Sequence, residues 1–119
     1  MVDSTSLKGG ELNAALTSAL VGIQTRYLGR GPKSASTFHH GNVVVVLMNE
    51  VMTHAEKSLA ATSNSHAVTN MRRLFQETME VGFRAAVERL TGKKVIAFIS
   101  CNHIDPDMAA ELFILDAPP

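Results

Sequence analysis

The chain has 119 residues, of which 45% are hydrophobic and 18% charged, and its eleven basic residues balance its eleven acidic ones. This length suits one compact domain, and zero net charge argues against a dedicated nucleic-acid-binding protein. No apolar run approaches the roughly 20 residues that span a bilayer, and the first residues lack the basic start and apolar stretch of a signal peptide. Because Cys101 is the single cysteine, no internal disulfide can form. We therefore expect a cytoplasmic protein that neither binds nucleic acid nor inserts into a membrane.

The N-terminal part predicts a lead-in followed by a helix. Residues 1–10 are small and polar, so we expect a flexible N-terminal lead-in before a single domain over residues 11–116. Apolar residues then recur at helical spacing, and Gly29 is placed to end the helix. Gln24 and Arg26 fall outside the predicted buried face. That face consists of Leu12, Leu16, Ala19, Leu20, Ile23 and Tyr27.

Two strands are predicted next, over residues 34–38 and 43–48, with a tight turn between them. The second contains four consecutive valines, and β-branched side chains favour extended backbone. Because the run does not alternate with polar residues, it predicts a strand that is covered on both faces or lies in the middle of the sheet. We place it as a central strand.

A short helix is predicted from His54 to about Ala61. Thr53 and Glu56 have the spacing of a capping box, in which each side chain accepts a hydrogen bond from the other residue's amide. The polar break that follows contains Ser65, a candidate N-cap for a longer helix.

Gly92 is predicted to end this longer helix. Arg72 falls on its predicted solvated side, and Glu80 and Arg84 have the i, i+4 spacing of an ion pair. The predicted buried stripe consists of Met71, Leu74, Phe75, Met79, Phe83, Ala86, Val87 and Leu90.

The C-terminal part predicts strands over residues 94–100 and 111–115, joined by a loop over residues 101–107. This connection is short enough for antiparallel pairing. The element order is therefore α-β-β-α-α-β-β. It predicts an α+β fold in which the helices pack on one face of a four-stranded, mainly antiparallel sheet.

The predicted loop over residues 101–107 raises the question of a metal site. Cys101 and His103 could donate sulfur and nitrogen to zinc, and Asp105 and Asp107 could add oxygen ligands. Because no second Cys or His pair stands at a fixed spacing, we favour a structured turn in which Asp side chains and Asn102 cap backbone amides. No cofactor is predicted. A metal- or small-anion-binding protein that uses the Cys101-His103-Asp105 loop is the alternative function.

Enzymatic activity is not expected. A catalytic cysteine needs a nearby base and a lowered pKa, and nothing around Cys101 in the sequence indicates either. The glycine-rich segment at residues 29–33 lacks the ending of a phosphate-binding P-loop. Together with the nearby Arg26, its bases Arg30 and Lys33 nevertheless form a candidate positive edge for an anion or an acidic partner.

Self-association is expected because an open sheet leaves exposed edge strands. Pairing with a second copy is a common way to protect such edges. The sequence therefore predicts a homo-oligomer, most simply a homodimer.

Several segments together resemble the MpsC-like family of small bacterial domains, long described only as a domain of unknown function. The likeness runs from about Leu12 to Leu115. The segments that carry it are residues 29–34 (GRGPKS), 53–59 (THAEKSL), 90–95 (LTGKKV), 98–107 (FISCNHIDPD) and 111–113 (ELF).

The resemblance implies an accessory role. The family takes its name from a membrane-potential-generating system whose other two components resemble a cation- or bicarbonate-translocating pair. The small component accompanies them without an established catalytic role, so this chain is expected to be a regulatory or accessory partner of membrane transporter subunits. No catalytic residue is carried over. The motif positions that match, without an assigned role, are Arg30, Pro32, Glu56, Asn102, His103, Asp105, Pro106 and Asp107.

Overall fold

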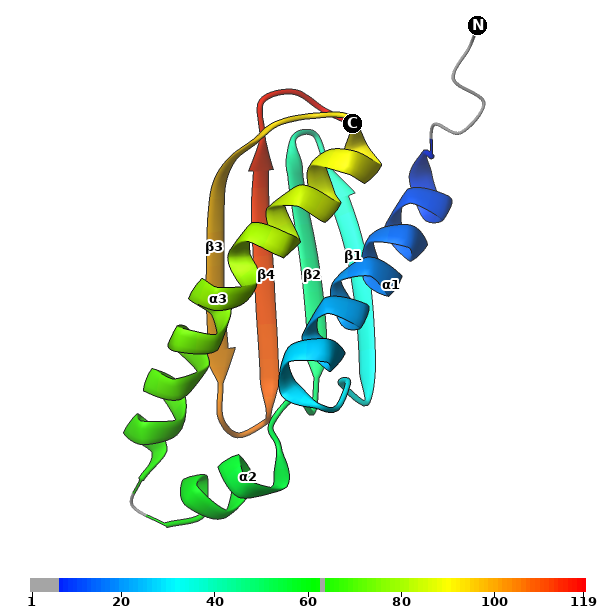
Figure 1. Cartoon of the computed structure of the whole chain (residues 1–119). Helices are drawn as coiled ribbons and strands as arrows, with labels where there is room; N and C mark the ends of the chain where they lie inside the picture. Colours follow the sequence, from blue (N-terminus) through cyan, green and yellow to red (C-terminus); the bar gives the residue numbers. More distant parts are fainter. Residues whose placement is uncertain (1–6, 63) are drawn as a thin grey trace, which may run out of the picture.

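A computed structural model describes residues 7–62 and 64–119. Helices α1 and α3 pack on one face of a four-stranded sheet, and α2 lies beyond the end of the strands beside α3, as Figure 1 shows. The strands follow the spatial order β1-β2-β4-β3, and every neighbouring pair is antiparallel. The predicted α+β fold and its element order are therefore confirmed.

Helix α1 spans Gly9–Leu28, so it begins inside the predicted lead-in. It ends as predicted at Gly29, whose φ of 79° lies in the left-handed region that glycine adopts without strain. The predicted buried face is wrong at one border. Tyr27 is 50% exposed and Gln24 is buried, because Tyr27 faces a groove between α1 and α3 instead of the sheet.

Strands β1 (Ser34–His40) and β2 (Val43–Asn49) form a hairpin. Strand β2 lies between β1 and β4, so the prediction of a central strand is confirmed. Its side chains alternate between the two faces of the sheet. Val44, Val46 and Met48 are buried under the helices, and Val43, Val45 and Leu47 point to the opposite face and are only partly covered.

Helix α2 spans His54–Ala60 and begins with the predicted capping box. The Glu56 amide donates to Thr53 Oγ1 at 3.2 Å, and the Thr53 amide donates to Glu56 Oε1 at 2.8 Å. The exchange satisfies two amides that the first helical turn would leave unpaired.

Helix α3 spans Ser65–Thr91 and ends as predicted at Gly92. Its N-cap is Asn64, one residue before the predicted Ser65. The predicted stripe is wrong at Leu74, which is 52% exposed, and Arg72 is buried, not solvated. Both errors arise because the first turns of α3 extend beyond the sheet and contact α2 (Figure 1). The predicted pair of Glu80 and Arg84 is present at 2.7 Å.

Strands β3 (Val95–His103) and β4 (Met108–Leu115) are longer than predicted. Residues 101–103 belong to β3 and pair with residues 108–110 of β4, so the loop is limited to residues 104–107. The polar side chains here carry no strand signal, but antiparallel pairing supplies the backbone hydrogen bonds that hold the segment extended.

The hydrophobic core lies between the helices and the sheet. Its largest fully buried side chains come from all the main layers: Leu16 and Leu20 of α1, Phe83 of α3, and Met48 and Phe113 of the sheet. In the described ranges, no helix is long and apolar enough to cross a membrane.

Candidate functional site

An open groove of about 600 Å³ lies between the C-terminal half of α1 and the C-terminal half of α3. Its apolar lining exists because α3 carries small residues where the two helices meet. A Cβ atom at Gly82 would already lie 3.7 Å from Ile23 Cδ1 and Cγ2. The residues that line the groove are Ile23, Arg26, Tyr27, Gly82, Ala85, Ala86 and Arg89.

Two arginines give the groove its positive charge. Arg26 and Arg89 are exposed and lie in the last turns of their helices, where a cation interacts favourably with the helix dipole. Neither guanidinium forms an ion pair with any residue in the described part of the chain. Tyr27, half exposed, adds an aromatic surface beside them.

The other two bases of the predicted positive edge lie outside this groove. Arg30 is partly buried, and its Nη1 and Nη2 donate to the carbonyls of Met52 at 3.1 Å and Glu50 at 3.3 Å. Lys33 is exposed and pairs with the Glu50 carboxylate at 3.4 Å. Arg30 therefore holds the connection between β2 and α2, and Arg26 alone of the three lines the groove.

The structure separates the side chains of the predicted loop site. Cys101 and His103 point to the sheet face away from the helices, as their i, i+2 spacing requires. His103 Nδ1 lies 2.8 Å from the Pro106 carbonyl oxygen, and Asp105 is exposed. No group of three or more potential His, Cys, Asp or Glu ligands comes together within residues 7–62 and 64–119.

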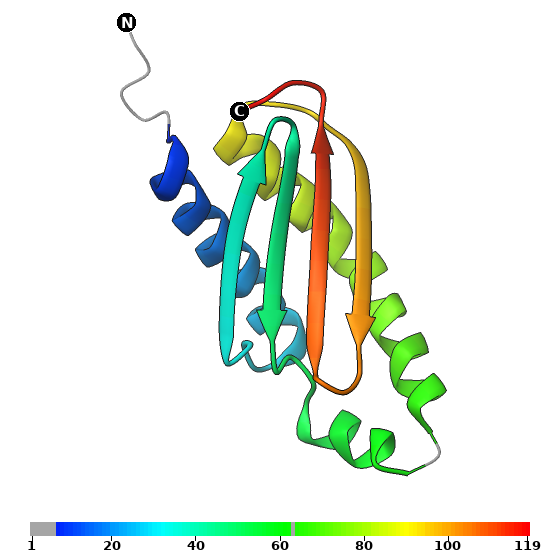
Figure 2. The same cartoon turned by 180° about the vertical axis from the view of Figure 1, so that it is seen from behind.

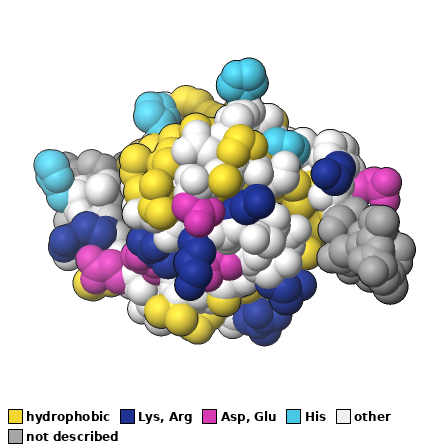
Figure 3. Space-filling model, turned by 90° about the horizontal axis from the view of Figure 1, so that it is seen from above, with side chains coloured by type: hydrophobic (Ala, Val, Ile, Leu, Met, Phe, Trp, Pro, Cys, Tyr) yellow, Lys and Arg dark blue, Asp and Glu magenta, His cyan; other side chains and the backbone are white. Residues whose placement is uncertain are grey.

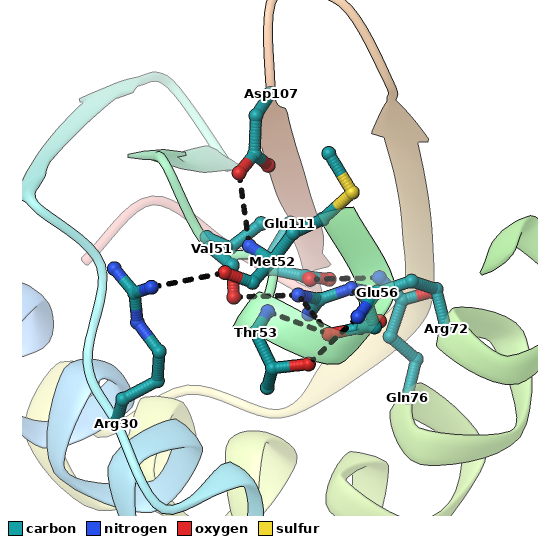
Figure 4. A network of polar contacts seen from close by, with 9 residues as sticks. All are labelled: Arg30, Val51, Met52, Thr53, Glu56, Arg72, Gln76, Asp107 and Glu111. Carbon is teal, nitrogen blue, oxygen red and sulfur yellow. Dashed lines mark hydrogen bonds and ion pairs between the residues drawn. The ribbon is translucent and has the colours of Figure 1, made fainter. Parts of the chain in front are cut away.

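Asn102 and Asp107, the remaining members, turn toward the helix side. Asp107 Oδ2 accepts a hydrogen bond from the Met52 amide at 2.9 Å (Figure 4). Met52 belongs to the β2–α2 connection, so Asp107 caps a backbone amide outside its own turn. Asn102 Oδ1 is buried without a hydrogen-bond partner among the described residues.

A buried polar network fills the space where α2, α3 and the sheet meet (Figure 4). Glu56 Oε2 lies 2.9 Å from Arg72 Nε, and both side chains are almost completely buried. Arg72 Nη2 also donates to Glu56 Oε1 at 3.1 Å and to the Val51 carbonyl. The network joins the capping box of α2 to α3 and to the connection between β2 and α2.

Glu111 is the third buried charge-bearing residue of this network. It lies on β4 between Val46 and Ser100 and faces the helices. Burial raises its pKa to about 7, against the smaller opposing effects of Ser100, Arg72 and Gln76. Gln76 Nε2 donates to Glu111 Oε1 at 3.4 Å, and Oε2 has no hydrogen-bond partner among the described residues.

A known protein family matches nearly the whole chain. Residues 8–117 match the model of a family described as "Na+-translocating membrane potential-generating system (MpsC)". The chain belongs to the MpsC family. The resemblance found in the sequence motifs is therefore confirmed. No curated protein and no solved structure matches the chain.

The motif residues of this MpsC-family chain now have structural positions. Arg30, Glu56 and Asp107 all bind the β2–α2 connection or its helix cap, so these matching positions stabilise one corner of the fold. The groove between α1 and α3, in contrast, has surface charge without an internal partner. It is the described feature with the chemistry of a binding site.

Sequence reasoning missed Arg72, Glu111 and Arg89. A signal existed for Arg72, which stands four residues from both Val68 and Gln76 and thus on a buried row of α3. Glu111 alternates with buried Ala109 and Phe113 in a strand, which places it on the same face. Arg89 carries no such signal, because only the crossing of two helices brings it to the groove with Arg26.

Proposed function

We propose that this protein is a non-catalytic, cytoplasmic accessory module of a Na+-translocating membrane system. It binds an acidic segment of a partner subunit in the groove between α1 and α3. The observation that carries this proposal is the pair of arginines, Arg26 and Arg89, which have no acid to pair with in the described chain. Membership of the MpsC family supports the connection to a membrane system.

The groove has the chemistry to bind a carboxylate beside an apolar side chain. A guanidinium presents paired donors that match the two oxygens of a carboxylate. Ile23, Ala86 and the ring of Tyr27 add apolar surface to the lining that they share with the arginines. A partner segment that combines acidic and hydrophobic residues fits this lining.

The module is further proposed to serve the transport of a cation or of bicarbonate. Because the other components of the family's system resemble a cation- or bicarbonate-translocating pair, this module is proposed to bind one of those two subunits. The alternative, metal or anion binding by Cys101, His103 and Asp105, has no geometric support comparable to that of the groove. The structure directs His103 to Pro106 and leaves Asp105 exposed.

Co-purification from native membranes in mild detergent tests the proposal. The wild-type chain should recover a membrane subunit that mass spectrometry identifies as a transporter component. The double variant Arg26→Glu/Arg89→Glu should recover at least tenfold less, and 0.5 M salt should weaken the wild-type complex because the interaction is electrostatic.

A matched control separates the groove from total charge. Lys57→Glu/Arg73→Glu changes the net charge equally at exposed positions outside the groove, and it should recover as much partner as the wild type. The proposal is wrong if the two double variants behave alike, or if no membrane subunit is recovered by the wild type.

A further inference from the structure

No helix of the described residues lies over the second face of the sheet, as Figure 2 shows. It is built from alternate residues of all four strands, and its two central strands contribute a continuous apolar surface. Its members are Ser34, Ser36, Phe38 and His40 of β1, Val43, Val45, Leu47 and Asn49 of β2, Met108, Ala110, Leu112 and Ile114 of β4, and Ala97, Ile99, Cys101 and His103 of β3. We call this surface the open face.

The open face carries no Asp, Glu, Lys or Arg on any strand. Phe38 is 50% exposed and Ile99 is 52% exposed. Seen along the strands, most visible Lys and Arg side chains lie toward the helix side, and the opposite rim carries hydrophobic side chains and histidines (Figure 3). An antiparallel sheet with one solvated face normally alternates hydrophobic with polar residues, and β2 does not.

We propose that a second copy of this chain covers the open face, so that two sheets pack face to face around a twofold axis. The valine run of β2 has the composition of a strand buried on both sides, and the helices of one chain bury only one side. A twofold interface places the same surface on both partners. Because the open face is uncharged, two copies can meet without burying an unpaired charge.

The dimensions of the open face suit a dimer interface. Four strands spaced about 4.8 Å apart and rising about 3.3 Å per residue cover roughly 500 Å² per copy, since the strands are 7 to 9 residues long. Two copies therefore bury about 1,000 Å², which reaches the lower limit for a biological interface and predicts a dimer that dissociates on dilution. Facing sheets would lie about 10 Å apart and cross at about 30°, as in sandwich folds.

The distribution of side chains also matches an interface, in which an apolar centre is surrounded by a polar rim. The central pair β2 and β4 supplies Val45 and Leu112, which are direct neighbours in the register. The polar members lie on the edge strands or near strand ends, as Ser34, His40 and His103 do. This surface faces away from the helix groove, so the inference stands independently of the proposed function.

Sedimentation equilibrium of the full chain over a range of concentrations tests the inference. The mass should rise to twice the chain mass of 12.8 kDa. Ile99→Lys and Phe38→Lys, each at an exposed position of the open face, should weaken the dimer at least tenfold and keep the circular dichroism spectrum of the wild type. The matched control is Val81→Lys on α3, where the side chain is 78% exposed, and it should remain dimeric.

The thiol of Cys101 distinguishes face packing from pairing of edge strands, because it is exposed on the open face. Its reaction rate with a maleimide should fall at least fivefold as the protein concentration rises through the dimer range. An edge-paired dimer would leave this thiol reactive. The inference is wrong if the dimer leaves Cys101 reactive or if Ile99→Lys does not weaken it. It is also wrong if the protein is a monomer at every concentration, including a monomer that binds neutral phosphatidylcholine vesicles through this face.

Discussion

Glu56 Oε2 and Arg72 Nε lie 2.9 Å apart in an ion pair that is almost completely shielded from water. Glu56 simultaneously caps α2, and Arg72 simultaneously binds the Val51 carbonyl in the connection between β2 and α2. One buried pair thus joins α2, α3 and the connection that leads out of β2 (Figure 4). Removal of either partner would leave an uncompensated charge in the interior, which is strongly destabilising.

Arg72→Ala should lower the free energy of unfolding by about 3 to 5 kcal/mol, because it leaves the Glu56 carboxylate buried without its partner. Urea denaturation followed by circular dichroism measures the change. Arg73→Ala, at the exposed neighbouring position, should change stability by less than about 0.5 kcal/mol. Equal effects of the two substitutions would show that the pair is not buried in solution.

Glu111 should make stability depend on pH. Its pKa rises from 4.5 to about 7 on folding, so the folded state binds this proton more tightly than the unfolded state does. Its contribution to the free energy of unfolding is therefore fully present below pH 4.5. This contribution falls by about 3 kcal/mol as the pH rises through 7.

Glu111→Gln should remove this dependence. We expect it to match the wild type near pH 4.5 and to be more stable by up to about 3 kcal/mol at pH 8. Unfolding free energies across this pH range provide the measurement, and Glu77→Gln at an exposed position of α3 is the control. A wild-type advantage at pH 8 would mean that the ionised carboxylate is stabilised in the fold.

Gly82→Ala should stabilise the protein by about 0.5 to 1 kcal/mol, because alanine is preferred to glycine inside a helix. The added Cβ would make ordinary contact with Ile23 at 3.7 Å. Gly22→Ala on α1, where a Cβ meets nothing within 4 Å, should stabilise similarly. Thermal melts compare them, and only Gly82→Ala should also weaken partner binding in the groove. A loss of stability at Gly82 alone would mean that the two helices approach more closely than the structure shows.

Arg30→Lys should destabilise the protein by about 1 to 2 kcal/mol, although it keeps the charge. A lysine ammonium cannot place donors on both the Met52 and Glu50 carbonyls as the guanidinium fork does. Lys33→Gln should have little effect, since its ion pair with Glu50 is exposed. Chemical denaturation provides the comparison. If Arg30→Lys were neutral, Arg30 would act through its charge, as the positive-edge hypothesis supposes.

Local chemistry made much of the fold predictable. The capping box at Thr53 and Glu56 and the glycine stops at Gly29 and Gly92 depend only on neighbours in the chain, and the structure confirms all of them. Errors occurred at the borders of helical stripes, at Tyr27 and Leu74. Periodicity defines the middle of a buried face, but the crossing of the neighbouring helices decides which border residues are covered.

The candidate site was less predictable than the fold. Arg26 was identified from its charge, but Arg89 lies more than sixty residues away and only helix packing brings it to the same groove. Arg30, identified for the same reason as Arg26, bonds instead to backbone carbonyls. The sequence shows which side chains are charged, but it does not show which hydrogen-bond acceptors lie near them in the folded chain.

The sequence alone predicted a neutral chain with an α+β fold, because composition, periodicity and capping signals act over a few residues, and its motifs pointed to the MpsC family. Tertiary structure decided which polar groups became buried partners and which arginines remained unpaired. It also decided that the valine-rich strand β2 has helices on only one face. These outcomes depend on contacts between segments that are distant in the sequence. Such contacts form, and offset the entropy of ordering the chain, only when the helices pack on the sheet.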